Sequence, residues 1–247
     1  MAARAILAAD IPQPAGRPVI PARLDIVIPC LNASATLPGT LDALARESGD
    51  GWACVTVADG GSADGTPAVA SAAGARVIAA SRGRGPQLAA GAAGGRAPWL
   101  LFLHADTRLG IGWRAAVERF AADPANERRA AYFRLRYDSA RPAARRLERI
   151  VAWRSRALGL PYGDQGMLIA RPFYEELGGF APLPLMEDVD LVRRIGRHRL
   201  AGLPADAVTS AARYERDGWL ARPARNLLCL TLYAAGVPPR LIRRVYG

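Results

Sequence analysis

The chain has 247 residues, of which 51% are hydrophobic and 22% charged, a balance typical of a folded globular protein and not of a disordered one. Its formal net charge is +11, and all 33 basic residues are arginines. The two halves differ, because residues 1–127 contain as many acidic as basic side chains and residues 128–247 carry the whole excess. This asymmetry indicates an anionic partner, for which nucleic acid, an anionic membrane and a phosphorylated ligand are candidates. A coding bias toward arginine explains the missing lysine but not the difference between the halves.

The cysteines indicate a reducing compartment. Three are present, Cys30, Cys54 and Cys229. Their number is odd and their spacing fits no metal site, so we expect a cytoplasmic protein. Asp10 and Pro12 interrupt any apolar run within 1–23, which we predict to be a flexible extension without a secretory signal. The longest apolar stretch, 227–237, is shorter than the roughly 20 residues of a transmembrane helix.

The first half alternates between apolar runs and helical patterns. Strands are predicted at 24–29, 52–57, 76–79 and 99–103. Helices are predicted at 37–45, 66–73, 86–95 and 113–120. Strands that alternate with helices of this length are joined by right-handed crossovers. We therefore predict an α/β fold in which a mostly parallel sheet is flanked by helices in a single domain.

The second half has a different pattern. An alternating strand is predicted at 130–137 and a short apolar strand at 167–170. Helices are predicted at 142–158, 172–177, 188–195 and 217–235. The first of these helices carries arginines outside its apolar face, and the last is mainly apolar. We expect one domain over 24–236, followed by a basic tail at 237–247.

Residues suited to ligand chemistry follow each of the first four predicted strands. The segments are 29–32, 58–66, 81–85 and 104–106. In open α/β sheets, ligands bind beyond the carboxyl ends of the strands, so these segments should meet at one edge. They supply glycines for close approach, carboxylates for hydroxyl groups or a metal, and Arg82 and Arg84 for phosphate. This combination predicts a nucleotide-diphosphate site.

Each of these residues also has a structural interpretation. Asp59 and Asp64 lie in a Gly/Ser segment where turn and cap residues are common, and the two arginines could belong to a solvated loop. The glycine segment lacks the Gly-Lys-Ser/Thr ending of a phosphate loop. His104 could be an interior histidine. Asp106 directly follows a buried strand, so it needs a partner, and a divalent cation is a natural one.

Two further acidic segments lie in the second half. The segment 163–166 (Gly-Asp-Gln-Gly) stands between a proline turn and an apolar strand. Glu187 and Asp188 begin a predicted helix, where the helix dipole stabilises carboxylates. Helix capping fits this position. General base catalysis fits it equally, with one acid held by the helix end and the other facing a cleft.

Five motifs occur in order along the chain. They are Ile28-Pro29-x-Leu31-Asn32, Val57-x-Asp59-Gly60-x-Ser62-x-Asp64-Gly65-Thr66, Phe102-Leu103-His104-Ala105-Asp106-Thr107, Gly178-Gly179-Phe180 and Glu187-Asp188. This set resembles family 2 glycosyltransferases of the GT-A fold, over about residues 24–236. The segments 104–108, 161–166 and 185–188 are similar to a small bacterial subgroup, often labelled diaponeurosporenoate-type or arsenosugar-type glycosyltransferase.

The resemblance implies a Rossmann-like GT-A domain with a nucleotide-sugar half at 24–127 and an acceptor half at 128–236. It implies that Asp59 lies beside the base and ribose and that Asp106 binds Mg²⁺ or Mn²⁺ on the donor diphosphate. Asp188 matches the catalytic base, and Glu187 is its companion. The other residues expected to bind the nucleotide-sugar are Pro29, Leu31, Asn32, Arg82, Arg84, Gln87, His104 and Ala105. Those expected on the acceptor side are Asp164, Gln165 and Gly166.

The sequence departs from the family's pattern at several positions. Gly60 replaces the second acid of the strand-end pair. His104 replaces the first acid of the metal motif, so the resemblance implies a weaker metal site with one carboxylate. The late histidine that often completes the metal shell is missing, and Arg213 or Arg216 is a candidate to serve the phosphates instead. A Gln-x-x-Arg-Trp motif is absent, which argues against a processive synthase.

The function implied by the resemblance is that of an inverting, metal-dependent glycosyltransferase. Such an enzyme would move a hexosyl group from a UDP-linked nucleotide-sugar to an acceptor. The acceptor would be lipid-like, or a small molecule with a hydroxyl or carboxyl group. The substitutions at Gly60 and His104 leave an alternative open, a catalytically degenerate GT-A module that only binds a nucleotide-sugar. Nucleic acid is not expected as a partner, because the arginines are not interleaved with stacking aromatic residues.

Peripheral contact with an anionic membrane, at the inner face of the cell membrane, is a further expectation. It rests on the basic helix at 142–158 and on the apolar C-terminal helix with its arginine tail. The alternative is that both helices pack on the sheet and their arginines simply face water. The sequence leaves both interpretations open.

Overall fold

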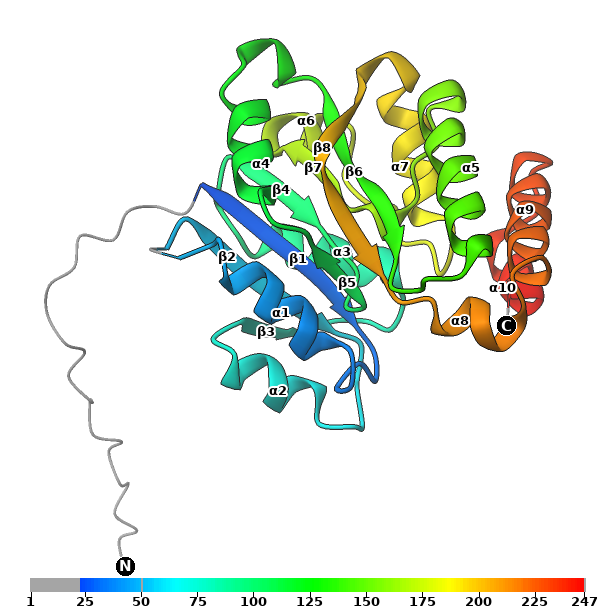
Figure 1. The fold of residues 1–247 in the computed structure, drawn as a ribbon. Helices are drawn as coiled ribbons and strands as arrows, with labels where there is room; N and C mark the ends of the chain where they lie inside the picture. The colour runs from blue at the N-terminus through cyan, green and yellow to red at the C-terminus, as the bar shows by residue number, and fades with distance from the viewer. Residues whose placement is uncertain (1–22, 50, 247) are drawn as a thin grey trace, which may run out of the picture.

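The computed structural model describes residues 23–49 and 51–246, so the predicted extension at 1–23 lies almost wholly outside the described residues. In the described part of the chain, one eight-stranded sheet is flanked by helices on both faces (Figure 1). The strands are β1 (Leu24–Cys30), β2 (Ala53–Asp59), β3 (Arg76–Ala79), β4 (Trp99–Phe102), β5 (Thr107–Leu109), β6 (Ala130–Tyr137), β7 (Met167–Ala170) and β8 (Leu200–Thr209). This arrangement confirms the predicted single-domain α/β fold.

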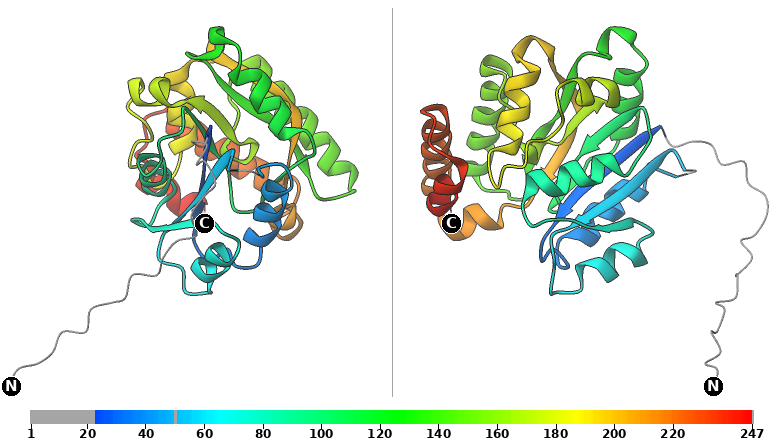
Figure 2. Two further views of the ribbon diagram at one scale, coloured as in Figure 1. Left: turned by 90° about the vertical axis from the view of Figure 1, so that its left-hand side faces the viewer. Right: turned by 180° about the vertical axis from the view of Figure 1, so that it is seen from behind.

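Helices connect these strands and continue to the C-terminus. The α-helices are α1 (Leu37–Ala45), α2 (Thr66–Ala72), α3 (Arg84–Ala93), α4 (Trp113–Ala121), α5 (Pro142–Leu158), α6 (Arg171–Glu176), α7 (Glu187–Ile195), α8 (Ala212–Asp217), α9 (Ala221–Ala234) and α10 (Pro239–Tyr246). Short 3₁₀ helices are η1 (Pro124–Asn126), η2 (Gly163–Gln165) and η3 (Arg197–Arg199). Figure 2 shows that α1 and α2 cover one face of the sheet and α3 and α7 the other. None of the helices in residues 23–49 and 51–246 could cross a bilayer, because none is both long and apolar enough.

The order of the strands brings the ligand-binding edge together. The sheet runs β3-β2-β1-β4-β7-β6-β8-β5, and its first four strands are parallel. In this register Cys30 is opposite Asp59, and Asp59 is opposite Ala79. β4 ends nearby, with Phe102 opposite Val27. The segments that follow these four strands therefore meet at one edge, as the strand-end rule predicts.

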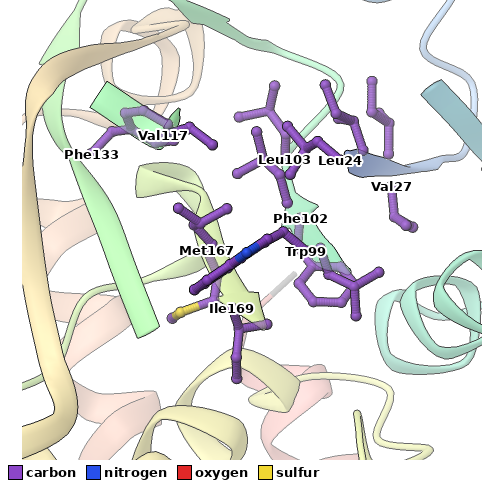
Figure 3. Close-up of a cluster of buried hydrophobic side chains, with 14 of the residues drawn as sticks. Leu24, Val27, Trp99, Phe102, Leu103, Val117, Phe133, Met167 and Ile169 are labelled. Atoms are coloured by element: carbon purple, nitrogen blue, oxygen red, sulfur yellow. The ribbon is translucent and has the colours of Figure 1, made fainter. Parts of the chain in front are cut away.

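The core lies between the sheet and its helices. β1 is buried along its whole length, as expected for a central strand that is covered on both faces. Figure 3 shows a cluster to which β1, β4, β6, β7 and α4 contribute. Its labelled members are Leu24, Val27, Trp99, Phe102, Leu103, Val117, Phe133, Met167 and Ile169. Truncating a fully buried member such as Phe133 to alanine should cost about 3–5 kcal/mol of stability.

The C-terminal third differs from the elements predicted for it. The helix expected at 217–235 corresponds to α9, which begins later, at Ala221, while α8 is a separate helix that ends at Asp217, before Gly218, where φ is +95°. A left-handed residue cannot continue an α-helix, and glycine adopts this conformation easily. β5, β8, α8 and α10 were not predicted as elements. α10 lies within the segment 237–247, and it packs against α9 through the buried side chains of Ile242 and Cys229.

Candidate functional site

A cleft of about 500 Å³ lies at the carboxyl ends of the parallel strands. All of the residues predicted to bind the nucleotide-sugar, apart from Asp59, line it: Pro29, Leu31, Asn32, Arg82, Arg84, Gln87, His104, Ala105 and Asp106. Two arginines from distant parts of the chain, Arg213 and Arg243, complete its basic lining. The cleft thus combines one carboxylate, Asp106, with several guanidinium groups, which is a lining suited to a diphosphate.

Asp59 and Asn32 fix the two loops that form one end of the cleft. The Asp59 carboxylate accepts hydrogen bonds from the amides of Gly61 and Ser62 and from the Ser62 hydroxyl. Asn32 has a left-handed backbone with φ of +52°, and its side-chain oxygen accepts from the amide of Ala63. The hydrogen bonds of these two side chains therefore shape the loops, and Asp59 does so from beneath the cleft surface.

Asp64 strengthens the same junction. Its carboxylate accepts from the hydroxyl and amide of Thr66 and from the amide of Ser34. The hydrogen bond from the Thr66 side chain, followed by that from Ser34, holds the pKa of Asp64 well below its usual range. Asp64 is thus a loop-fixing acid, in agreement with the turn-or-cap interpretation of this residue.

Gln87 occupies the space beside Gly60, the position where the family pattern has a second acid. Gln87 is 3% exposed, and its Nε2 atom donates to the carbonyl oxygens of Cys30 at 2.6 Å and Ala58 at 2.8 Å. A Cβ atom at position 60 would lie 3.0 Å from this Nε2. The glycine and the buried amide therefore form a matched pair, which holds the ends of β1 and β2 together.

Glu187 and Asp188 begin α7 after a strained residue. Met186, which precedes them, has a left-handed backbone with φ of +68°. Glu187 is buried, and its Oε1 atom lies 2.9 Å from Nε of Arg84. Burial raises the pKa of Glu187 to about 7, although the Arg84 charge opposes this change. The acid at the helix start is thus paired with an arginine of the cleft.

The Asp188 carboxylate is held at both oxygens. Its Oδ2 accepts from the amide of Gly163 at 2.8 Å, and its Oδ1 accepts from the amide of Val189. His104 lies beside this contact, because a Cβ atom at position 163 would be 2.6 Å from His104 Nε2 and 3.4 Å from Asp188 Oδ2. Burial, followed by the charge of Arg84, lowers the pKa of His104 to about 4. The imidazole is therefore neutral at pH 7.

A second hollow, a pocket of about 110 Å³, adjoins the cleft and lies against Asp188. The residues that line both hollows are Arg84, His104, Asp106, Ser210 and Arg213. Asp188 lines the pocket but not the cleft. The Nη2 atom of Arg213 is 4.0 Å from Oδ2 of Asp106 at this junction. The two hollows therefore meet where the predicted metal ligand lies.

The three residues expected on the acceptor side have different surroundings. Asp164 lines the pocket, and its Oδ1 atom is buried with no hydrogen-bond partner among the residues that the structure describes. Burial raises the pKa of Asp164 to about 6. Gln165 is buried and bonds to the Ser155 hydroxyl and the Phe133 carbonyl, and Gly166 packs on the Phe133 ring. Only Asp164 of the three is thus available to a ligand in the pocket.

The comparisons with known proteins agree with this geometry. Residues 25–157, more than half of the chain, match the model of the family described as Glycosyl transferase family 2. The chain belongs to glycosyl transferase family 2. No curated protein sequence matches it significantly.

Solved structures show the same fold at low sequence identity. One is glucosyl-3-phosphoglycerate synthase from Mycobacterium tuberculosis, in complex with Mn²⁺, UDP and glucosyl-3-phosphoglycerate. Its sequence is 20% identical to this chain, and the TM-score is 0.58. The match covers 88% of this chain and 81% of the synthase chain. A mannosyltransferase from Pyrobaculum calidifontis, in complex with GDP-Man and Mn²⁺, is 20% identical with a TM-score of 0.61, over 85% and 62% of the two chains. S. aureus TarS 1–349 is 12% identical with a TM-score of 0.63, over 91% and 69%.

This member of family 2 has few protein ligands for a metal. In residues 23–49 and 51–246, no three His, Cys, Asp or Glu side chains are close enough to hold an ion by themselves. The Asp106 carboxylate and the neutral His104 imidazole are the donors at the junction. Mg²⁺ usually keeps several waters and binds one or two carboxylates together with substrate phosphates. The residues present therefore fit an ion that the donor diphosphate helps to hold, and not a metal held by protein alone.

The family motifs do not reveal the contribution of the C-terminal helices. Arg243 of α10 lines the cleft, while Asn226 and Leu230 of α9 and Tyr246 of α10 line the pocket. The arginines of the segment at 237–247 are the sequence signal that could have indicated this, because an anionic ligand attracts such a cluster. Of the two arginines considered for the phosphates, Arg213 lies at the junction, and Arg216 pairs with Asp217 instead.

Proposed function

We propose that the protein transfers a hexosyl group from a UDP-linked sugar to a hydroxyl or carboxyl group of an acceptor, with inversion at the anomeric carbon. The observation that carries this proposal is that the cleft and the pocket meet at Arg84, His104 and Asp106. Asp188 lines the pocket but not the cleft. A donor in the cleft would present its sugar toward the pocket, and an acceptor there would lie beside a carboxylate. This is the arrangement that a direct displacement requires.

The charges at the junction support departure of the nucleoside diphosphate. Arg84 and Arg213 line both hollows, so they would lie beside the leaving phosphate oxygen, where fixed positive groups lower the barrier. Asp106 would hold Mg²⁺ or Mn²⁺, and the bound ion would supply further neutralisation of the diphosphate. Arg82 and Arg243 would bind the remaining diphosphate oxygens along the cleft.

Asp188 would remove the proton of the acceptor group during the attack. Its carboxylate is fixed by the amides of Gly163 and Val189, so the base has a defined position before the acceptor binds. Glu187 does not contact the pocket, and its role would be to position Arg84 through their ion pair. The two adjacent acids would thus have different tasks.

The nucleotide would bind at the end of the cleft that the loops around Asn32 and Asp59 form. Their hydrogen bonds fix the loop backbone, and the buried amide of Gln87 lies beside Gly60, which replaces the second acid of the family pattern. The relatives named above contain UDP in one case and GDP-Man in the other, so the fold accepts more than one base. We favour UDP, as the resemblance of the whole motif set to family 2 glycosyltransferases implies.

The acceptor would be an amphipathic molecule of the kind that the diaponeurosporenoate-type subgroup label suggests. Asp164 and Tyr162 offer polar contacts near Asp188, whereas Leu185, Met186 and Leu230 form an apolar wall of the pocket. A small hydroxyl or carboxyl compound would satisfy only the polar part. We therefore place a lipid-like acceptor first, and the protein in the cytoplasm, where nucleotide-sugars are made.

The decisive experiment is an intact-mass screen with UDP-glucose, UDP-galactose and GDP-mannose against a host lipid extract, with Mn²⁺ present. The proposal expects a hexose mass added to an acceptor together with stoichiometric UDP. The alternative is a module that binds nucleotide-sugar without catalysis, motivated by Gly60 and His104. Calorimetric binding of UDP and Mn²⁺ without transfer to any acceptor or to water would favour that module and contradict the proposal.

A further inference from the structure

Helix α9 exposes an uncharged, mostly apolar stripe. The exposed residues at helical spacing are Leu220, Ala224, Leu227, Leu228, Thr231 and Ala235. Leu227, for example, is 63% exposed. Surface helices of globular proteins normally turn their charged and polar face to solvent, so a stripe of this kind indicates a contact surface.

Helix α10 packs against α9 and exposes further apolar side chains together with positive charge. Leu241 and Val245 are exposed and four residues apart, and the exposed arginines Arg240 and Arg244 lie beside them with the same spacing. The two helices form one unit, because the Arg222 guanidinium of α9 stacks over the Tyr246 ring at 4.5 Å. From position 218 to the end, the sequence contains five arginines and no aspartate or glutamate.

We propose that this surface, the outer side of α9 and α10, docks on an anionic lipid bilayer. The leucines and Val245 would enter the boundary between headgroups and acyl chains, and Arg240 and Arg244 would contact anionic headgroups. A second copy of this chain is a poorer occupant. A symmetric contact would bring the same arginines together, and this surface has no carboxylate side chain to neutralise them.

The position of the two helices in the molecule agrees with such a role. Both lie at the end of the molecule remote from β2, β3 and α2 (Figures 1 and 2). α5 lies at the same end, and its exposed side includes Ile150 and Trp153 together with arginines. Trp and Arg are side chains that favour the bilayer interface.

Docking has a consequence for the pocket. The other side of α9 contributes Asn226 and Leu230 to the pocket wall, so the docking helix separates the pocket from the surface that we assign to the bilayer. Docking would therefore place the pocket one helix away from the bilayer that holds a lipid-like acceptor. This last step rests on the proposed function, whereas docking itself does not.

Vesicle co-sedimentation of the full chain, without donor or acceptor, tests docking. We expect the protein to pellet with vesicles of phosphatidylcholine and phosphatidylglycerol and to remain largely in the supernatant with phosphatidylcholine alone. The variant Arg240→Gln/Arg244→Gln should bind the anionic vesicles roughly 30-fold more weakly, because each arginine near such a surface contributes about 1 kcal/mol. Leu227→Glu/Leu228→Glu should abolish binding.

The matched control is Ile111→Glu, which changes a 94% exposed isoleucine in the loop between β5 and α4. It should bind like the wild type, and all variants should keep the wild-type circular dichroism and melting temperature. Equal loss of binding in Ile111→Glu would overturn the proposal, and so would a wild-type protein that stays in the supernatant with both vesicles. A dimer that Leu227→Glu/Leu228→Glu converts to a monomer, without vesicle binding, would assign the surface to a second copy instead.

Discussion

The Nε atom of Arg84 lies 2.9 Å from Oε1 of Glu187, and this ion pair joins α3 to the start of α7 beneath the junction of the two hollows. Glu187 is 1% exposed, and neither of its carboxylate oxygens accepts a hydrogen bond with good geometry from the described residues. The charge of Arg84 is therefore the main compensation for its burial. The pair makes the position of Arg84 depend on the ionisation of Glu187.

This dependence predicts opposite effects of pH on activity and stability. The pKa of Glu187 is raised to about 7, so the ion pair forms as pH rises through 7 and kcat/KM should rise between pH 6 and 8. The folded state binds the proton more tightly than the unfolded chain, so the free energy of unfolding should fall as pH rises toward 7. Glu187→Gln should remove the rise in kcat/KM and reduce kcat about ten-fold. A wild-type pH profile retained in this variant would contradict the positioning role.

Asp188→Asn should abolish transfer and leave donor binding intact. The asparagine oxygen can still accept from the Gly163 amide, so the local structure should persist while the base is lost. We expect kcat to fall by about 10³-fold, in the range measured for lost general bases, and the calorimetric affinity for UDP to stay within two-fold. Turnover within ten-fold of the wild type would show that another group removes the proton.

Removal of the divalent ion and removal of its predicted ligand, Asp106, should both impair transfer. Chelation with EDTA should abolish transfer, and Asp106→Ala should reduce kcat/KM about 100-fold and weaken binding of Mn²⁺ in the presence of UDP. Asp42→Ala is a suitable control, because Asp42 is an exposed acid of α1 outside both hollows. Full activity in EDTA would mean that Arg84 and Arg213 neutralise the leaving group without a metal.

Local sequence patterns predicted most elements of the first half of the fold, with β5 as the exception. The apolar runs at 24–29 and 76–79 and the helical pattern at 37–45 correspond closely to β1, β3 and α1. α3 begins at Arg84 rather than at Pro86. Gly85 allows this start, because a Cβ atom there would lie 2.4 Å from the carbonyl oxygen of Ala181 in another part of the chain.

The elements that the patterns missed depend on tertiary contacts. β8 contains Gly202 and Pro204, which disfavour a strand, and its pairing with β6 and β5 overrides this local preference. The residues of the site likewise divide into those that local motifs predicted and those that tertiary contacts bring there. The strand-end motifs predicted the lining of the cleft, whereas Arg243 reaches it only because α10 folds back against α9.

Gly163 should tolerate no side chain, because it separates His104 from Asp188. An alanine Cβ would lie 2.6 Å from His104 Nε2, so the imidazole would have to move. Gly163→Ala should therefore reduce kcat/KM about 100-fold, since displacements near 1 Å in a reacting site have effects of this size. Gly49→Ala is the control, because a Cβ atom at position 49 meets nothing within 4 Å. If both variants retain full activity, the packing of His104 against residue 163 does not matter for transfer.

Asp164 should act on the acceptor and not on the donor. Its Oδ1 atom is buried in the pocket without a partner among the described residues, and an acceptor hydroxyl would supply the missing donor. Burial raises the pKa of this carboxyl to about 6, so the acceptor KM should fall as pH rises through 6 and the ionised form accumulates. Asp164→Asn should raise the acceptor KM at pH 7.5 at least ten-fold, because a hydrogen bond to a charged group contributes about 1.5–3 kcal/mol. The donor KM measured in the same assays is the internal control. An equal change in the donor KM and the acceptor KM would mean that Asp164 supports the fold of the loop at 163–166 instead of binding the acceptor.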